Sequence, residues 1–175
     1  MTFLLCTLVG AMTIGVAGTA LAGPSCDVMN GPTPYSDLQA AFDAAALGDT
    51  LTVSGLCWGP FTVGQNVTVA GSGISTATLT ASPGAPVLTV SNGATFIGTA
   101  FTLSGGQGGD GTAGAVGTPG ANGADGQPGG ILNHGQTDLL GVLISGNTGG
   151  NGGNGDLEVG SEGDGGMGGA GGIES

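Results

Sequence analysis

The chain has 175 residues, of which 42 are glycine; it carries 12 acidic residues and no Lys or Arg, so its formal net charge is −12. A nucleic-acid-binding protein needs Lys or Arg to release the counterions of the phosphates. A protein on an anionic membrane surface needs the same side chains to contact lipid headgroups. The composition therefore argues against nucleic acid and against an anionic membrane surface as partners, and the length suits one domain.

Residues 1–22 have the pattern of a secretory signal peptide. An uncharged apolar run covers residues 3–17, and Ala20 and Ala22 then provide an A-x-A cleavage site. We expect cleavage after Ala22, although only the α-amino group of Met1 supplies the positive charge usual at the start of such peptides. An uncleaved membrane anchor is the alternative, because about 20 apolar residues can span a bilayer. The pattern predicts a secreted or cell-surface protein.

Cleavage would remove Cys6 and leave two cysteines, Cys26 and Cys57, in an oxidising compartment. Cysteines in even number usually form bridges there, so a disulfide between them is predicted, with two buried free thiols as the alternative. These two cysteines and the single His134 lack the spacing of metal ligands. We therefore expect no metal site and no cofactor.

Residues 23–50 are predicted to form an N-terminal segment with a capping helix. Ser36 fits the N-cap of a capping box with Gln39 at the third helical position, and Gly48 ends the helix. Beyond residue 50 the apolar period changes from 3.6 to 2, in short runs separated by Gly, Asn, Ser and Pro. These runs are 51–53, 61–63, 67–69, 78–80, 87–90, 95–97 and 101–103. No Asn-Gly hairpin turn with long flanking strands is evident, so stacked parallel strands are favoured over a β-sandwich.

A repeat supports the stacking of these strands. Runs at 87–90, 94–97 and 100–104 recur at 131–133, 137–140 and 142–145; each set precedes a glycine-rich stretch that ends in Gly-Gly-Ile, at Ile131 and Ile173. We predict solenoid rungs over 51–148, a glycine-rich insertion at about 105–130, a second insertion over 149–172, and the start of a truncated rung at 173–175. Both insertions should leave the solenoid at the same corner and lie side by side, with Ile131 stacked on Ile173.

Several motifs resemble the start of secreted bacterial right-handed parallel β-helix proteins, which have a pectate-lyase-like fold. These motifs lie at 26–30, 35–42, 48–53, 55–57, 61–63 and 66–71. Segments 129–133 and 144–148 are similar to the repeats of polymorphic outer-membrane and adhesin-type proteins. The resemblance implies an all-β, right-handed parallel β-helix with a capping helix and a Cys26–Cys57 pair. It implies little about activity, because this fold carries lyases, hydrolases and adhesins.

The glycine tracts fit three different structures. From Gly105 to Ile131 glycine recurs every third residue for nine triplets, with Pro119 and Pro128 in the third place, which is the collagen pattern. A disordered loop is the plain alternative. Polyproline-II runs packed closely through their glycines are the third possibility, and by composition they resemble snow-flea antifreeze proteins.

Two acidic stretches are weak candidates for ion binding. Residues 105–112 nearly match the calcium-binding nonapeptide of RTX proteins, but Thr112 stands where a large hydrophobic residue belongs, and one copy cannot build the site. The second stretch is interpreted as a solvated loop, and its acidic residues are Asp156, Glu158, Glu162 and Asp164.

Other residues admit a functional and a plain interpretation. Trp58 could stack on a sugar ring or pack over the disulfide, and Asn66 begins a glycosylation sequon that matters only in eukaryotic secretion. A ladder of Thr76, Thr78 and Thr80 could bind ice or glycan, although outward threonine is ordinary on strands. His134 is interpreted as a turn residue rather than a general base.

The sequence predicts an exported, non-enzymatic β-helix, a structural or adhesive surface module with a possible glycan or cell-surface partner. No catalytic residue is assigned, because Asp138 is the only carboxylate within a predicted strand and a hydrolase of this kind needs a pair. The alternative is a polysaccharide-binding or polysaccharide-cleaving β-helix whose catalytic rungs are missing. An ice-binding protein is the third hypothesis.

Overall fold

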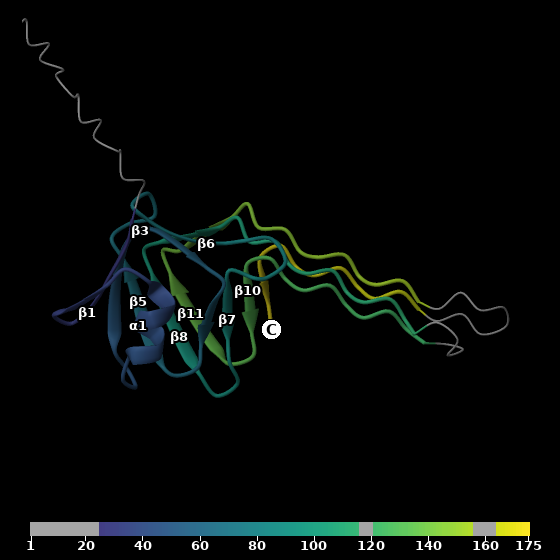
Figure 1. The fold of residues 1–175 in the computed structure, drawn as a ribbon, viewed down its shortest axis with the longest axis horizontal. Coiled ribbons are helices and arrows are strands. Elements are labelled where there is room, and N and C mark those ends of the chain that lie inside the picture. Colours follow the sequence, from purple (N-terminus) through teal and green to yellow (C-terminus); the bar gives the residue numbers. More distant parts are fainter. Residues whose placement is uncertain (1–24, 116–120, 156–163) are drawn as a thin grey trace, which may run out of the picture.

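The computed structural model describes residues 25–115, 121–155 and 164–175. This part of the chain is mostly β, with one helix, α1 (Leu38–Ala44), and parallel strands in curled sheets (Figure 1). The strands, in chain order, are β1 (Cys26–Asn30), β2 (Thr33–Tyr35), β3 (Thr50–Gly59), β4 (Phe61–Val63), β5 (Val67–Gly71), β6 (Ala77–Ala81), β7 (Leu88–Val90), β8 (Thr95–Thr99), β9 (Thr102–Ser104), β10 (Ile131–Asn133), β11 (Gln136–Leu140), β12 (Leu143–Ser145) and β13 (Ile173–Glu174).

Sets of three strands follow one another in parallel. The first half of β3 pairs with β5 and its second half with β6, while β4 pairs with β7. Next to β5, β6 and β7 lie β8, β9 and β10, and next to these lie β11, β12 and β13. One sheet therefore has the order β11-β8-β5-β3-β6-β9-β12, and the other has the order β13-β10-β7-β4.

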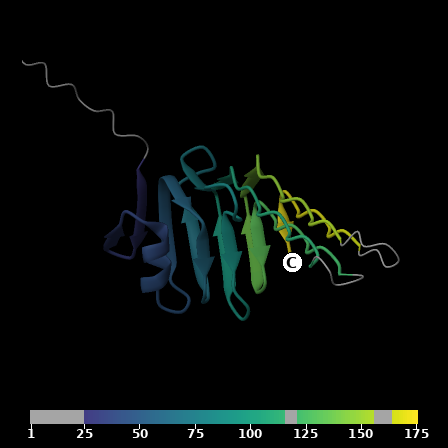
Figure 2. The ribbon, with the colours of Figure 1, turned by 45° about the vertical axis from the view of Figure 1, so that its right-hand side comes forward.

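The strand repeat predicted from the sequence is confirmed in register. Ile131 pairs with Leu88 on one side and with Ile173 on the other, and Ile144 pairs with Leu103. The fold prediction is confirmed in its coarser form, as parallel strands in curled sheets with one helix (Figure 2).

The N-terminal segment contains an antiparallel hairpin that the sequence analysis did not predict. Asn30 pairs with Thr33 across the turn Gly31-Pro32, in which Gly31 has a φ of 56°, a conformation that glycine adopts readily. Strand β1 also pairs antiparallel with β3, with Val28 opposite Val53. The alternation that marks a strand is faint here, because Val28 is the only fully buried side chain of β1.

Helix α1 begins one residue later than predicted. Its N-cap is Asp37, not Ser36, because the Asp37 carboxylate accepts the N–H of Ala40 at 2.7 Å. Gln39 consequently does not close a capping box. Its side-chain amide instead contacts the backbone of Thr62 in β4, accepting its N–H at 2.7 Å and donating to its carbonyl at 3.1 Å. The predicted capping position is therefore wrong, and Gln39 fastens the helix to the sheet.

The core runs from α1 through the inward-facing residues of successive strands. Phe42 of the helix meets Phe61 of β4 edge to face, with ring centroids 6.3 Å apart. Further along, Phe96 meets Phe101 in the same way at 6.4 Å. Each fully buried Leu, Ile, Val or Phe contributes about 1.5 to 3 kcal/mol. The largest fully buried side chains are Phe61, Phe96, Phe101, Leu38, Leu51, Leu79, Leu88, Leu103, Ile131, Val28, Val53 and Val63.

The predicted disulfide is present between Cys26 of β1 and Cys57 of β3, whose Cα atoms are 4.6 Å apart. Such a bond is typical of an oxidising, extracellular environment. In the described ranges, no helix has the length and apolar character needed to cross a membrane. The predicted signal peptide, residues 1–22, lies outside the described residues.

Candidate functional site

The two glycine tracts form one structure, here called the glycine array. It consists of a first outward segment (105–115), a first return segment (121–130), a second outward segment (146–155) and a second return segment (164–172). Figure 1 shows the four segments running together away from the strands. The first tract connects β9 to β10 and the second connects β12 to β13. Because β9 pairs with β12 and β10 pairs with β13, the roots of the two tracts lie at the same corner of the body.

Segments that run in the same direction are joined by hydrogen bonds at every third residue. In the outward pair, the N–H groups of Gly108, Gly111 and Gly114 donate to carbonyls of the second outward segment at 2.7 to 2.8 Å. In the return pair, Gly126 donates to Met167 at 2.7 Å, and its neighbours three residues away bond in the same way. The spacing matches polyproline II, which has three residues per turn and no internal hydrogen bonds.

Segments that run in opposite directions are also bonded. Ala124 and Gln127 donate their N–H groups to the first outward segment, and Gly150 and Gly153 donate to the first return segment, all at 2.8 Å. Gly166 donates to Gly153 at 2.7 Å. The array thus has two layers, one with the outward segments and one with the return segments, and backbone bonds run within and between the layers.

Close packing of backbones explains the glycine at every third position. A Cβ atom placed on Gly126 would lie 2.3 Å from the carbonyl oxygen of Gly150, and one on Gly111 would lie 1.9 Å from that of Ala124. Neither contact is sterically possible, so a side chain at these positions would force the segments apart. The physical requirement is the one that puts glycine at the axis of collagen, but here it is met within a single chain.

Three polar side chains on the outer surfaces reinforce the pairing. The Asp110 carboxylate accepts the N–H of Asn151 at 2.7 Å, the Asp125 carboxylate accepts that of Met167 at 2.7 Å, and the Asn122 side-chain oxygen accepts that of Asp164 at 2.9 Å. In each pair a side chain of the first tract binds the backbone of the second. The triplets carry acceptors where the neighbouring tract offers N–H groups.

The prediction that both tracts share a corner and lie side by side is confirmed. A disordered loop does not describe residues 105–115, 121–130, 146–155 and 164–172, since backbone hydrogen bonds join all four segments. Among these residues the bonds run between segments of one chain, which is the arrangement of packed extended runs proposed as the third alternative.

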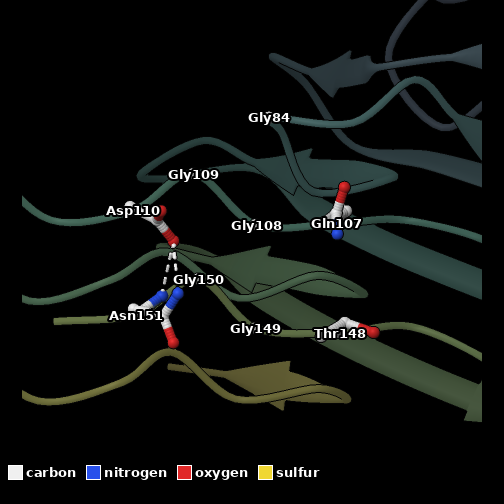
Figure 3. Close-up of a pocket in the computed structure, with 9 residues that line it drawn as sticks. All are labelled: Gly84, Gln107, Gly108, Gly109, Asp110, Thr148, Gly149, Gly150 and Asn151. Carbon is white, nitrogen blue, oxygen red and sulfur yellow. Dashed lines mark hydrogen bonds between the residues drawn. The ribbon is translucent and has the colours of Figure 1, made fainter.

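A groove of about 360 Å³ lies at the root of the array, along the two outward segments. Figure 3 shows Asp110 and Asn151 at one end of it, joined by hydrogen bonds from the Asn151 backbone and side-chain nitrogens at 2.7 and 3.2 Å. The lining offers mainly backbone amides with neutral and acidic side chains, which suits hydrogen bonding to an uncharged polar ligand. The lining residues are Gly84, Gln107, Gly108, Gly109, Asp110, Thr148, Gly149, Gly150 and Asn151.

Trp58 points away from the disulfide. Its side chain is 61% exposed, while the neighbouring Cys57 is fully buried. Successive side chains of a strand point to opposite faces, so the interpretation that Trp58 packs over the disulfide is wrong. The indole lies on the outer surface beside Thr80, its partner in β6.

Thr76, Thr78 and Thr80 do not form the ladder that was one interpretation of the sequence. Thr76 lies in the turn before β6, where its hydroxyl contacts Ser72 at 2.8 Å, and Thr80 is 8% exposed. Only Thr78 has a threonine beside it in the next strand of the sheet, Thr102. The three residues follow one another along the chain, whereas a ladder needs them at equivalent positions of neighbouring strands.

The remaining sequence candidates stay apart from one another. His134 is exposed in the turn between β10 and β11, and Asp138 is exposed on β11 beside Ile97. The side-chain oxygen of Asn66 accepts the N–H of Thr95 at 2.8 Å, so this sequon residue serves the fold. Within the described ranges no group of three His, Cys, Asp or Glu could hold a metal ion. Of the acidic cluster at 156–164, only Asp164 lies within the described residues.

Two other polar residues have structural roles that the sequence analysis missed. Asn147 bridges the roots of the tracts: its side-chain oxygen accepts the N–H of Gly106 at 2.9 Å, and its nitrogen donates to Leu103 at 3.1 Å. Asp49 accepts hydrogen bonds from the Asn30 side chain and from the Ala46 N–H, and the Asn30 bond in particular holds its pKa below the ordinary value. Asn147 lies in segment 144–148, and the similarity of that segment to adhesin-type repeats is the signal that could have drawn attention to it.

In comparisons with known proteins, no family model, no curated protein and no solved structure matches this chain.

Proposed function

We propose that this chain is an exported, non-enzymatic surface module: a right-handed parallel β-helix that carries the glycine array as a structural or adhesive extension. The observation that carries this proposal is the array, in which four backbone segments are hydrogen-bonded at every third residue and project from the body (Figure 2). Such an arrangement holds polar groups at fixed positions away from the body. An extension of this kind suits contact with another surface.

The parallel strand sets support the β-helix as the finer description of the body. Each set contributes one strand to each of three parallel ladders, as successive coils of a solenoid do. The disulfide supports export, because such bonds persist in oxidising compartments. A net charge of −12 fits a partner that is neutral or basic, such as an uncharged glycan or a cell-surface protein, better than an acidic polysaccharide.

A non-enzymatic role is supported by the separation of the candidate catalytic groups. His134 and Asp138 are both exposed, and the groove at the array root holds a single carboxylate, Asp110, already bonded to Asn151. Acid–base hydrolysis of a glycoside needs two carboxyl groups on either side of the bond.

The loop of residues 82–87 suggests a way to test the array without disturbing the body. This loop connects β6 to β7 at the corner where the longer tracts connect β9 to β10 and β12 to β13. A variant in which both tracts are replaced by the sequence of this loop, Ser-Pro-Gly-Ala-Pro-Val, should keep the strand sets and lose only the array.

The experiment is surface display of the intact chain and of this variant, with binding measured on immobilised neutral glycans and on whole cells. The proposal predicts that the intact chain binds and that the variant, in which the amides of strand β5 keep their protection from hydrogen exchange, does not. Equal binding by both chains would show that the array is not the adhesive part. Turnover of a polysaccharide by the intact chain would show that it is an enzyme.

Polysaccharide binding through the body is a second candidate, favoured by the 61% exposure of Trp58. An exposed indole offers an apolar face on which a sugar ring can stack. If this candidate is correct, glycan binding should persist in the variant without the array and should be lost on Trp58→Ala.

A further inference from the structure

The loop of residues 82–87 is a short counterpart of the two glycine tracts. It lies beside the first tract, because β6 pairs with β9 and β7 pairs with β10. Gly84 in the middle of the loop donates its N–H to Gln107 at 2.8 Å, as Gly108 of the first tract donates to Thr148 of the second at 2.8 Å (Figure 3). Since β9 lies between β6 and β12, the loop covers the side of the first tract that faces away from the second tract, but only at the root.

The second tract packs on the first through glycines that have no room for a side chain. A Cβ atom at each of three such glycines would lie between 1.9 and 2.0 Å from a carbonyl oxygen of the first tract. The pairs, with the glycine first, are Gly153 with Thr112, Gly166 with Ala124, and Gly169 with Gln127. One tract can therefore lie this close to another only if it has glycine at these positions.

The first tract has side chains at the equivalent positions. Equivalent residues of the two tracts are 41 positions apart in the outward segments and 42 apart in the return segments. On this register the equivalents of the three glycines are Thr112, Ala124 and Gln127, and all three are exposed. Their side chains project from the first tract in the direction of the loop, where a neighbouring tract would need the same space.

Glycine is kept in the first tract where the loop itself lies alongside. Gly109 is the equivalent of Gly150, and a Cβ atom on Gly109 would lie 3.1 Å from the carbonyl oxygen of Gly84, which is a tight contact. The side-chain oxygen of Gln127 lies 3.6 Å from that same Cβ position. The first tract thus has glycine beside the backbone of the loop, and the Gln127 side chain extends to the place where the loop turns back.

We propose that Thr112, Ala124 and Gln127 close the glycine array on the side of the loop, so that the first tract is the outermost full-length tract there. The carbonyls of Asp110 and Asp125 accept no hydrogen bond from any described residue, so the backbone could bond a further glycine-rich segment. The three side chains hold such a segment beyond hydrogen-bond distance. Native proteins block exposed backbone edges in this way against unwanted pairing. The closure involves only residues of the array and is independent of whether the module is adhesive.

The test adds a third full-length tract at the root that the loop now occupies. In one chain, residues 82–87 are replaced by a copy of residues 106–130, which the strand register places in line with the loop. A second chain carries the same copy together with Thr112→Gly, Ala124→Gly and Gln127→Gly. The copied tract should pack on the first tract only in the second chain, because only there can the two backbones approach each other.

Amide hydrogen exchange measures this packing. In a packed copy, the residue copied from Gly126 donates its N–H to the Asp125 carbonyl, as Gly126 itself donates to Met167 at 2.7 Å. Exchange of that copied amide should be at least about tenfold slower in the second chain than in the first. Equal exchange of this amide in the two chains would overturn the proposal, whether the copied tract packs in both chains or in neither.

The matched control is Ala113→Gly in the first chain. Ala113 is exposed and adjoins Thr112, but its equivalent in the second tract is Asn154, so its side chain does not face the loop. This substitution should leave exchange of the copied tract unchanged, and protection of the copy by it would also overturn the proposal. The Gly169 N–H, bonded to Gly150 at 2.8 Å, reports that the array is folded in every chain. If the triple substitution frees this amide, Gln127→Gly alone takes its place with the same copied amide as the readout.

Discussion

Ile173 lies beside Ile131 in a parallel strand pair, yet Ile131 is fully buried and Ile173 is 44% exposed. The two residues occupy equivalent positions at the end of successive glycine tracts. Strand β10 lies between β7 and β13, whereas β13 lies at the edge of its sheet. Burial at this position is therefore set by the strand that follows and not by the residue type.

This difference predicts unequal effects of the same substitution. Ile131→Ala should lower the free energy of unfolding by about 2 to 5 kcal/mol, because it leaves a cavity among fully packed side chains. Ile173→Ala should lower it by less than about 1 kcal/mol, since much of the side chain is already in contact with water. Urea denaturation followed by circular dichroism measures both values. Similar losses from the two variants would contradict the burial difference.

Gly126→Ala should loosen the array and leave the body intact. The new methyl group would lie 2.3 Å from the Gly150 oxygen, so the first return segment must move away from the second outward segment. We expect the amides of Gly150 and Gly169 to exchange at least about tenfold faster, which corresponds to a loss of about 1.4 kcal/mol of local stability. Exchange within the core strand β5 should not change. Unaltered exchange in the array would show that the close contact is not required.

The parallel register of the strands could be predicted from the sequence because the chain repeats itself. Gly-Gly-Ile occurs at the end of both tracts, and the runs of apolar residues that precede the tracts keep the same order, so Ile131 and Ile173 could be matched from the sequence. The β1–β2 hairpin could not be predicted in this way. Its side chains alternate weakly, and Met29 of β1 is 39% exposed. The pairing of β1 with β3 depends on contacts that no local pattern records.

The structure of the glycine tracts could not be predicted from the sequence, and the reason is a different one. Glycine at every third residue fits a collagen trimer, a disordered loop and packed extended runs equally well. What distinguishes them is the position of the partner backbone, which depends on the strand sets that bring the two roots together. The same holds for Asp110, whose role as an acceptor for the Asn151 N–H exists only when the second tract lies beside it.

Asp49 should make a pH-dependent contribution to stability at the N-terminal end of the body. Hydrogen bonds from Asn30 and Ala46 lower its pKa in the folded chain. A lowered pKa means that the contribution is complete above the pKa of the unfolded chain and is lost as the pH falls through the lower folded-state pKa. Nuclear magnetic resonance titration should show Asn30→Ala moving the Asp49 pKa upward, and the stability difference from wild type should shrink in acid. An unchanged pKa in this variant would contradict the assigned cause.

Asn147 supplies the most specific test of how the two tracts are joined at their roots. Its side chain accepts from Gly106 and donates to Leu103, so it needs both ends of the amide. Asn147→Asp keeps the acceptor, but at neutral pH it sets a carboxylate oxygen against the Leu103 carbonyl, and we expect a loss of about 1 to 3 kcal/mol. In acid the protonated carboxyl regains a donor, so the loss relative to wild type should decrease as the pH falls.

The control is Asn154→Asp, at an exposed position of the same segment, which should change stability by less than about 0.5 kcal/mol at either pH. Chemical denaturation of the three chains across the acid range measures these differences. A loss that stayed constant with pH would mean that the Leu103 bond contributes nothing and that Asn147 acts through Gly106 alone.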